Sequence, residues 1–190
     1  DVDEQLGLII RETVGRGGRV LLPSFAVGRV QALLHSLQKL RSSDRIPREM
    51  PIFLDSPMAI QATALYQRPH RLMRLTSRQA SALSDDIRMI ATPQQSERLT
   101  RSRYPCVIIS ASGMATGGRV LHHLKMMAPD GRNHIAFPGF QVAGTRGAKL
   151  VAGATEVKIH GEYVPVKASV SQSEGYSGHA DAQGLMNWMQ

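Results

Sequence analysis

Residues 107–124 have the sequence VIISASGMATGGRVLHHL, and the rest of the chain is organised around them. The stretch begins with an apolar, β-branched run at 107–109, which predicts a buried strand. Small residues follow, and a helical segment is expected from Arg119. A strand, a small-residue loop and a helix N-terminus form a geometry that can hold a phosphate, because free backbone N–H groups and the helix dipole face the loop.

Several residues of this loop are candidate phosphate ligands. Glycines let the backbone approach an anion closely, and hydroxyl groups add hydrogen-bond donors. The candidates are Ser110, Ser112, Gly113, Thr116, Gly117 and Gly118. The loop matches neither the G-x-G-x-x-G pattern nor the Lys-Ser/Thr ending of a P-loop. A tight strand-to-helix connection without a ligand therefore stays open as the alternative.

The composition indicates a basic globular protein. The chain has 190 residues, of which 42% are hydrophobic, and this is enough for one domain with a buried core. Its net charge of +8 favours polyanionic partners such as nucleic acid or an anionic membrane surface. We expect no membrane span and no signal peptide. The single cysteine, Cys106, can form neither an intrachain disulfide nor a cysteine-rich zinc site, which favours a reducing compartment, the cytoplasm.

Apolar periodicity predicts an alternation of helices and strands. Helices are expected at 1–14, 27–40, 58–66, 92–102 and 182–189, with a short helix within 139–153. Strands are expected at 19–23, 52–54, 87–90, 107–109 and 134–137, followed by a pair at 156–159 and 163–171. The segment 68–86 has no clear pattern, and we assign it no element. The alternation predicts an α/β fold with a mostly parallel central sheet and helices on both faces.

Polar and small residues directly follow several of the predicted strands. Ser24, Asp55, the loop 110–118 and the loop 139–146 all come after strand ends. In an open parallel sheet, ligands bind beyond the carboxyl ends of the strands. We therefore expect these segments to converge on one edge of the sheet. Asp55 precedes a Ser-Pro pair, which favours a helix cap over an acid catalyst for its carboxylate.

Five motifs occur in one order along nearly the whole chain: LLPSFAVGRVQALL, PIFLDSPMA, ISASGMATGGRVLHHL, GFQVAGTRGAKL and EGYSGHAD. Together they resemble the β-CASP family of RNA-processing nucleases, a branch of the metallo-β-lactamase fold. In that family a β-CASP domain is inserted into a lactamase domain, and the active site lies in the cleft between the two. The resemblance implies that residues 1–172 form the β-CASP domain and that residues 173–190 begin the returning lactamase segment.

The family's zinc ligands are expected outside this chain. The family holds two zinc ions with a His-x-His-x-Asp-His motif and further His and Asp residues, and the sequence contains no such motif. The segment His160-Gly161-Glu162 has the letters of a late ligand motif, but it stands before the Ser-Gly-His motif. The resemblance therefore implies zinc in the whole protein, no metal ligand here and an inactive isolated chain.

The resemblance also implies roles for individual residues. His179 matches the family histidine that donates or positions a proton at the scissile phosphate, and imidazole suits this role because its pKa lies near working pH. Asp181 is expected to orient His179, and Ser177 to bond the phosphate. Ser24, Arg29 and Arg146 are the further candidates for phosphate or RNA contacts. For the two arginines, solvated surface side chains remain the alternative.

The function implied is the RNA-binding, substrate-clamping part of a zinc-dependent RNA hydrolase. The expected partners are single-stranded RNA and the lactamase domain of the same protein, with a second copy of the chain as a further candidate. The apolar residues Leu185, Met186, Trp188 and Met189 of the last predicted helix would pack on that domain. The alternatives are a basic α/β module that binds nucleic acid without cleaving it and a mononucleotide-binding enzyme of another class.

Overall fold

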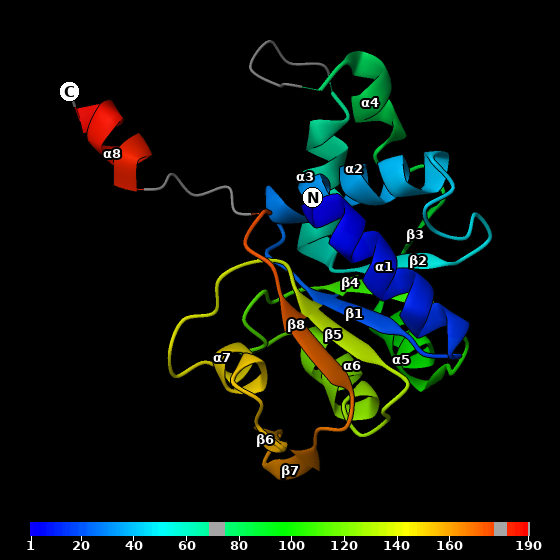
Figure 1. Cartoon of the computed structure of the whole chain (residues 1–190). Helices are drawn as coiled ribbons and strands as arrows, with labels where there is room; N and C mark the ends of the chain where they lie inside the picture. The colour runs from blue at the N-terminus through cyan, green and yellow to red at the C-terminus, as the bar shows by residue number, and fades with distance from the viewer. Residues whose placement is uncertain (69–74, 177–181, 190) are drawn as a thin grey trace.

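The computed structural model describes residues 1–68, 75–176 and 182–189, and Figure 1 shows their arrangement. In these ranges six strands form a sheet in the order β3-β2-β4-β1-β5-β8, and every neighbouring pair is parallel. The strands are β1 (Val20–Pro23), β2 (Ile52–Asp55), β3 (Ile87–Met89), β4 (Val107–Ser110), β5 (His134–Phe137) and β8 (Ser169–Gln172). Two further strands, β6 (Glu156–Ile159) and β7 (Glu162–Pro165), form a separate antiparallel hairpin.

Helices cover both faces of the sheet (Figure 1). One face carries α1 (Val2–Gly15), α2 (Arg29–Ser42), α3 (Pro57–Tyr66) and α4 (Ser77–Ala82), and the other carries α5 (Pro93–Arg101), α6 (Val120–Met127) and α7 (Arg146–Val151). The protein has two hydrophobic cores, one on each face of the sheet. Val20 and Leu22 of β1 pack in one core, and Leu21 between them packs in the other. Alternate side chains of a strand point to opposite faces, so a strand buried on both faces needs consecutive apolar residues. The predicted α/β fold is confirmed.

Local sequence explains where the helices begin. The Ser56 hydroxyl accepts the Ala59 N–H at 3.3 Å, and a proline occupies the first helical position of α3. At α5, Thr92 and Gln95 form a capping box. Helix α2 begins at Arg29 rather than at residue 27, because Gly28 before it has a φ of +80°, in the left-handed region.

The structure differs from the predicted elements in two places. The segment 163–171 was predicted as one strand, but the chain leaves the hairpin after β7 and pairs again with β5 as β8, the edge strand of the main sheet. Backbone N–H groups of Lys167 and Ala168 donate to the Ala128 carbonyl at 2.7 and 2.9 Å, and this anchor turns the chain back to the main sheet. The unassigned segment contains α4, a short helix that begins at a capping box of Thr76 and Gln79.

Cys106 is buried immediately before β4. Burial raises the pKa of its thiol to about 12, so the thiolate needed for redox or nucleophilic chemistry does not form near neutral pH. No helix in the described part of the chain is both long enough and apolar enough to cross a bilayer.

Candidate nucleic-acid interface

The loops that follow β1, β2, β4 and β5 meet at the carboxyl edge of the sheet. Pro23 and Asp55 both align with Ser110, so these strands end at one level. The Ser24 N–H donates to the Ser110 carbonyl at 2.9 Å. From the loop after β5, the Gln141 side chain reaches across and donates to the carbonyl of the β4 loop at position 113, at 3.2 Å. The convergence expected from the strand ends is confirmed, and the roles of the individual residues stay predictions.

Ser112 organises the small-residue loop from within. Its Oγ accepts the N–H groups of Thr116 and Gly117 at 3.2 and 3.4 Å and lies 3.2 Å from the Thr116 hydroxyl. Its own backbone N–H donates to the Gly117 carbonyl at 3.3 Å. These bonds close the loop without a ligand, so a phosphate contact from Ser112 or Thr116 would compete with bonds already made.

Three glycines of this loop differ in what an added side chain would meet. Gly118 has a φ of +79°, and a Cβ there would lie 2.7 Å from the Ala111 carbonyl oxygen, so a side chain is strained at this position. A Cβ on Gly113 would lie 2.9 Å from the Phe25 ring. A Cβ on Gly117 would meet open space. Gly118 and Gly113 are therefore needed for the fold, whereas position 117 has room for a side chain, although the Gly117 N–H already donates to Ser112 Oγ.

Ser110 and Ser24 are fully buried. The Ser110 hydroxyl donates to the Asp55 carbonyl at 3.0 Å and ties β4 to β2. The Ser24 hydroxyl has no hydrogen-bond partner in the part of the chain that the structure describes. Buried polar atoms are almost always paired in proteins, so this hydroxyl has a free bonding position for a water or a ligand.

Arg29 places a buried cation at the same edge. Its side chain is 8% exposed, its Nε donates to the Tyr176 carbonyl at 3.3 Å, and its guanidinium carbon lies 5.0 Å from the Phe25 ring centroid. A Cβ on Gly139 would lie 2.6 Å from that carbon, so a glycine makes room for the guanidinium. Within the described ranges no carboxylate forms an ion pair with Arg29. Burial lowers its pKa, and a bound anion would offset the loss of solvation.

Arg146 ties the loops together. Its Nε donates to the Lys158 carbonyl at 2.8 Å, and its Nη1 donates to the Ala115 carbonyl in the β4 loop. These contacts join α7, the β6 strand and the small-residue loop. Two of its donors are thus engaged with backbone oxygens, which is the arrangement of a structural link. Its predicted phosphate contact would have to come from the remaining donors of the guanidinium.

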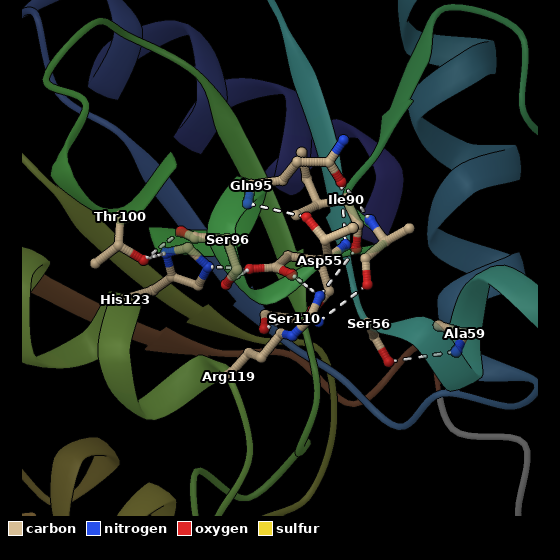
Figure 2. Close-up of polar contacts among 12 residues, drawn as sticks. Asp55, Ser56, Ala59, Ile90, Gln95, Ser96, Thr100, Ser110, Arg119 and His123 are labelled. Carbon is tan, nitrogen blue, oxygen red and sulfur yellow. Dashed lines mark hydrogen bonds and ion pairs between the residues drawn. The ribbon is translucent and has the colours of Figure 1, made fainter. Parts of the chain in front are cut away.

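A buried charged cluster lies beneath the loop, and Figure 2 shows its contacts. The Asp55 carboxylate accepts from Arg119 Nη1 at 2.8 Å, from the Ser96 hydroxyl at 2.5 Å and from His123 Nε2 at 2.6 Å. His123 Nδ1 lies 3.0 Å from the Thr100 hydroxyl. The cluster joins β2, α5 and α6, and both Asp55 and His123 are fully buried.

The cluster corrects the expected role of Asp55. The cap of α3 is Ser56, whereas Asp55 turns its carboxylate toward α5 and α6. Burial alone would raise the pKa of Asp55, but hydrogen bonds from His123, Ser96 and Arg119 outweigh burial and hold it below its ordinary value. Asp55 is therefore a charged structural centre and does not carry a proton at neutral pH.

Two residues of this interface were missed or misread from the sequence. Gln141 is 6% exposed, and its Nε2 donates to the carbonyls of Gly113, Gly139 and Phe140, while its Oε1 has no partner among the described residues. His123 was assigned no part in the site from the sequence, and the structure buries it against Asp55. For Gln141, an amide side chain between two apolar residues was a sequence signal of a buried role. For His123, two adjacent histidines on a short helix gave no such signal.

The predicted catalytic residues His179 and Asp181, and with them Ser177, lie outside the described residues. In the described ranges, no group of three or more His, Cys, Asp or Glu side chains is placed to hold a metal ion. The described residues therefore do not fit a zinc site, since a catalytic zinc needs about three protein ligands.

Comparison with known proteins identifies the family. Residues 30–150 match the family described as the Beta-Casp domain. The chain belongs to the β-CASP family. Residues 163–190 of this β-CASP chain also match the Zn-dependent metallo-hydrolase RNA specificity domain.

Three relatives of this β-CASP chain show the range of similarity. It is 39% identical to ribonuclease TTHA0252 of Thermus thermophilus, over 96% of this chain and 43% of that protein. It is 33% identical to transcription termination factor FttA of Pyrococcus horikoshii, over 100% of this chain and 30% of that protein. It is 32% identical to an RNase J-like protein of Methanocaldococcus jannaschii, over 99% of this chain and 44% of that protein. The chain thus spans less than half the length of each of these relatives.

Proposed function

We propose that this chain is the RNA-binding, substrate-clamping part of a zinc-dependent RNA hydrolase. The observation that carries the proposal is the carboxyl edge of the sheet, where there is open space at Gly117 of the β4 loop and the buried guanidinium of Arg29, at the start of α2, lies beside Gly139 of the β5 loop. A cation that has no carboxylate partner among the described residues, beside a loop with open space at a glycine, suits a phosphate. The net charge of +8 and the similarity to proteins named as ribonucleases support RNA as the polyanion.

We infer that residues 1–172 form the β-CASP domain and that residues 173–190 begin the returning lactamase segment. The pairing of β8 with β5 supports the boundary, because it keeps the chain in the main sheet up to Gln172. Helix α8 (Ala182–Met189) supports a further contact beyond it, since Leu185, Met186, Trp188 and Met189 are more than half exposed. An apolar group of this size on a helix surface is expected to be covered by another part of the protein or by a second copy.

The proposed chemistry of this chain is one proton transfer. When the phosphodiester bond breaks, His179 donates a proton to the leaving oxygen, Asp181 holds the imidazole, and Ser177 bonds a phosphate oxygen. The zinc ligands and the attacking water belong to the remainder of the protein. The cytoplasm is the proposed location, with single-stranded RNA as substrate.

The isolated chain is expected to bind no stoichiometric zinc and to cleave no RNA. The reason is the ligand set, because the described residues contain no metal cluster and a catalytic site needs about three ligands. Metal analysis of the purified chain beside a ribonuclease assay with and without chelator measures both properties. One zinc per chain together with cleavage that the chelator abolishes would contradict the assignment.

Gly117→Val is expected to weaken RNA binding while the fold is kept. Position 117 has open space around it and no positive φ, so the added side chain blocks the anion without straining the loop. Gly118→Val is unsuitable because it would strain the backbone. Affinity for a single-stranded RNA is measured at several salt concentrations, and the wild-type slope should be about −0.7 per phosphate contact.

The matched control is Ala64→Val, which adds similar bulk to an exposed position of α3. Circular dichroism checks the fold of both variants. Wild-type affinity that does not depend on salt, or unchanged affinity in a folded Gly117→Val variant, would show that the loop does not bind the RNA backbone.

A further inference from the structure

A second group of cations lies at the opposite, amino edge of the sheet. Arg19 immediately precedes β1, and Asn133 immediately precedes β5. Between them opens a pocket of about 340 Å³. Its lining includes five cationic side chains and one carboxylate: Arg19, Arg101, Arg103, Lys125, Arg132 and Asp130. The pocket is separate from the loops at the carboxyl edge.

Arg19 is the buried member of this group. It is 5% exposed, and its Nη1 donates to the carbonyls of Thr100 and Ser102 at 3.3 and 2.6 Å. In the described part of the chain, Arg19 forms no ion pair with a carboxylate. Burial is the main cause that lowers its pKa; the charge of Asp130 acts in the opposite direction, and the charges of Arg103 and Arg132 act in the same direction as burial. A buried guanidinium among like charges is stabilised by an anion in the pocket.

The acidic residues nearby do not balance these charges. The Asp130 carboxylate forms an ion pair with Arg132 at 2.7 Å, and this contact lowers the pKa of Asp130 to about 2. This carboxylate therefore balances one of the cations of the pocket. Arg101 and Lys125 form ion pairs with Glu97 and Glu162 outside the pocket lining. The Arg101–Glu97 pair is exposed and Lys125 is partly exposed, and such surface pairs contribute little to stability.

Arg103 has no carboxylate partner among the described residues and is exposed at the pocket. Its guanidinium is free to bind a phosphate with two parallel N–H groups. Tyr104 next to it is 45% exposed, and its ring lies 6.2 Å from the Phe53 ring. An exposed aromatic ring next in sequence to a cation of a basic pocket is typical of surfaces on which a nucleobase stacks.

We propose that this pocket is a second phosphate-binding site that takes a backbone phosphate of an RNA strand. The proposal rests on the proposed function for the identity of the polyanion. Helix α6 connects the two sites, because Arg119 at its start follows the β4 loop and Lys125 and Met126 in its last turn line the pocket. Its 8 residues span about 12 Å. An RNA strand that runs along α6, on the lower side of the sheet in Figure 1, would contact both sites.

The test compares Arg103→Ala with Arg11→Ala, which removes the same charge from an exposed position of α1. With a long single-stranded RNA, Arg103→Ala is expected to weaken binding about tenfold and to reduce the salt slope by about 0.7. Arg11→Ala should change both much less. Titration with inorganic phosphate forms a second arm, and RNA should compete with it. Circular dichroism checks that both variants are folded.

The outcomes separate this proposal from the proposed function. If Arg103→Ala loses affinity while Gly117→Val binds RNA as the wild type does, the amino-edge pocket is supported and the carboxyl-edge site fails. If Gly117→Val loses RNA affinity while Arg103→Ala binds RNA as the wild type does, the second site is overturned. Inorganic phosphate binding that Arg103→Ala abolishes, with unchanged RNA affinity, shows a site for free phosphate and overturns the RNA assignment. Equal losses of RNA affinity in Arg103→Ala and Arg11→Ala would mean that only the net charge matters, and this result overturns the second site as well.

Discussion

Asp55→Ala is expected to lower the free energy of unfolding by about 3–5 kcal/mol, the range for removing one partner of a buried ion pair. The carboxylate is fully buried and accepts from Arg119, Ser96 and His123 within 2.8 Å. Without it, the Arg119 guanidinium loses its ion pair and keeps two carbonyl acceptors, and the buried His123 ring loses the partner of its Nε2. Chemical denaturation followed by circular dichroism measures the change. The loop should also lose order, because Arg119 directly follows Gly118.

The control for this substitution is Glu97→Ala on α5. Glu97 also forms an ion pair, with Arg101 at 2.6 Å, but both side chains are more than half exposed. Its removal is expected to change stability by about 0.3–0.5 kcal/mol. A loss of similar size in both variants would mean that the Asp55 cluster does not hold the three elements together.

The difference between wild type and Asp55→Ala also has a predicted dependence on pH. The folded-state pKa of Asp55 lies below its ordinary value, so its contribution to stability is complete above about pH 4 and is lost as pH falls through the lower folded value. Denaturation at pH 7 and at pH 5 should therefore give the same difference. A difference that already shrinks at pH 5 would show that the folded state raises this pKa.

From the proposed function, His179→Ala in the full-length protein is expected to reduce single-turnover cleavage by a factor of about 10² to 10⁴, the range for loss of a general acid. RNA affinity should change much less, because a proton donor acts in the transition state. Cleavage rate and affinity are measured on the same RNA. A rate loss fully explained by weaker binding would remove His179 from the proton transfer.

The matched control is His160→Asn, at an exposed position of the β6–β7 turn. His160 has a φ of +48°, and asparagine tolerates this left-handed region. Cleavage and affinity should both stay near the wild-type values. If His160→Asn slowed cleavage as strongly as His179→Ala, the assignment of the proton donor to the Ser-Gly-His motif would be wrong.

Hydrophobic pattern alone determined most of the fold. The apolar run before Ser110 and its counterparts before Ser24 and Asp55 predicted buried parallel strands, because a strand covered on both faces cannot alternate with polar residues. From those strand ends, the meeting of four loops at one edge followed, since parallel strands end at the same side. The division of the predicted strand 163–171 did not follow, because which edge a strand joins depends on backbone contacts that the local pattern does not contain.

The sequence by itself determined most of the element order, the parallel sheet, the loops at its carboxyl edge and the β-CASP motifs. Only the tertiary structure decided that Asp55 is a buried ion-pair centre, that Arg146 links backbone segments and that the pocket at Arg19 exists. The reason is physical: strands and loops follow from residues close in sequence, whereas charge balance depends on contacts between distant ones. The bond from Arg19 to Ser102 joins residues 83 positions apart, and folding alone brings them together.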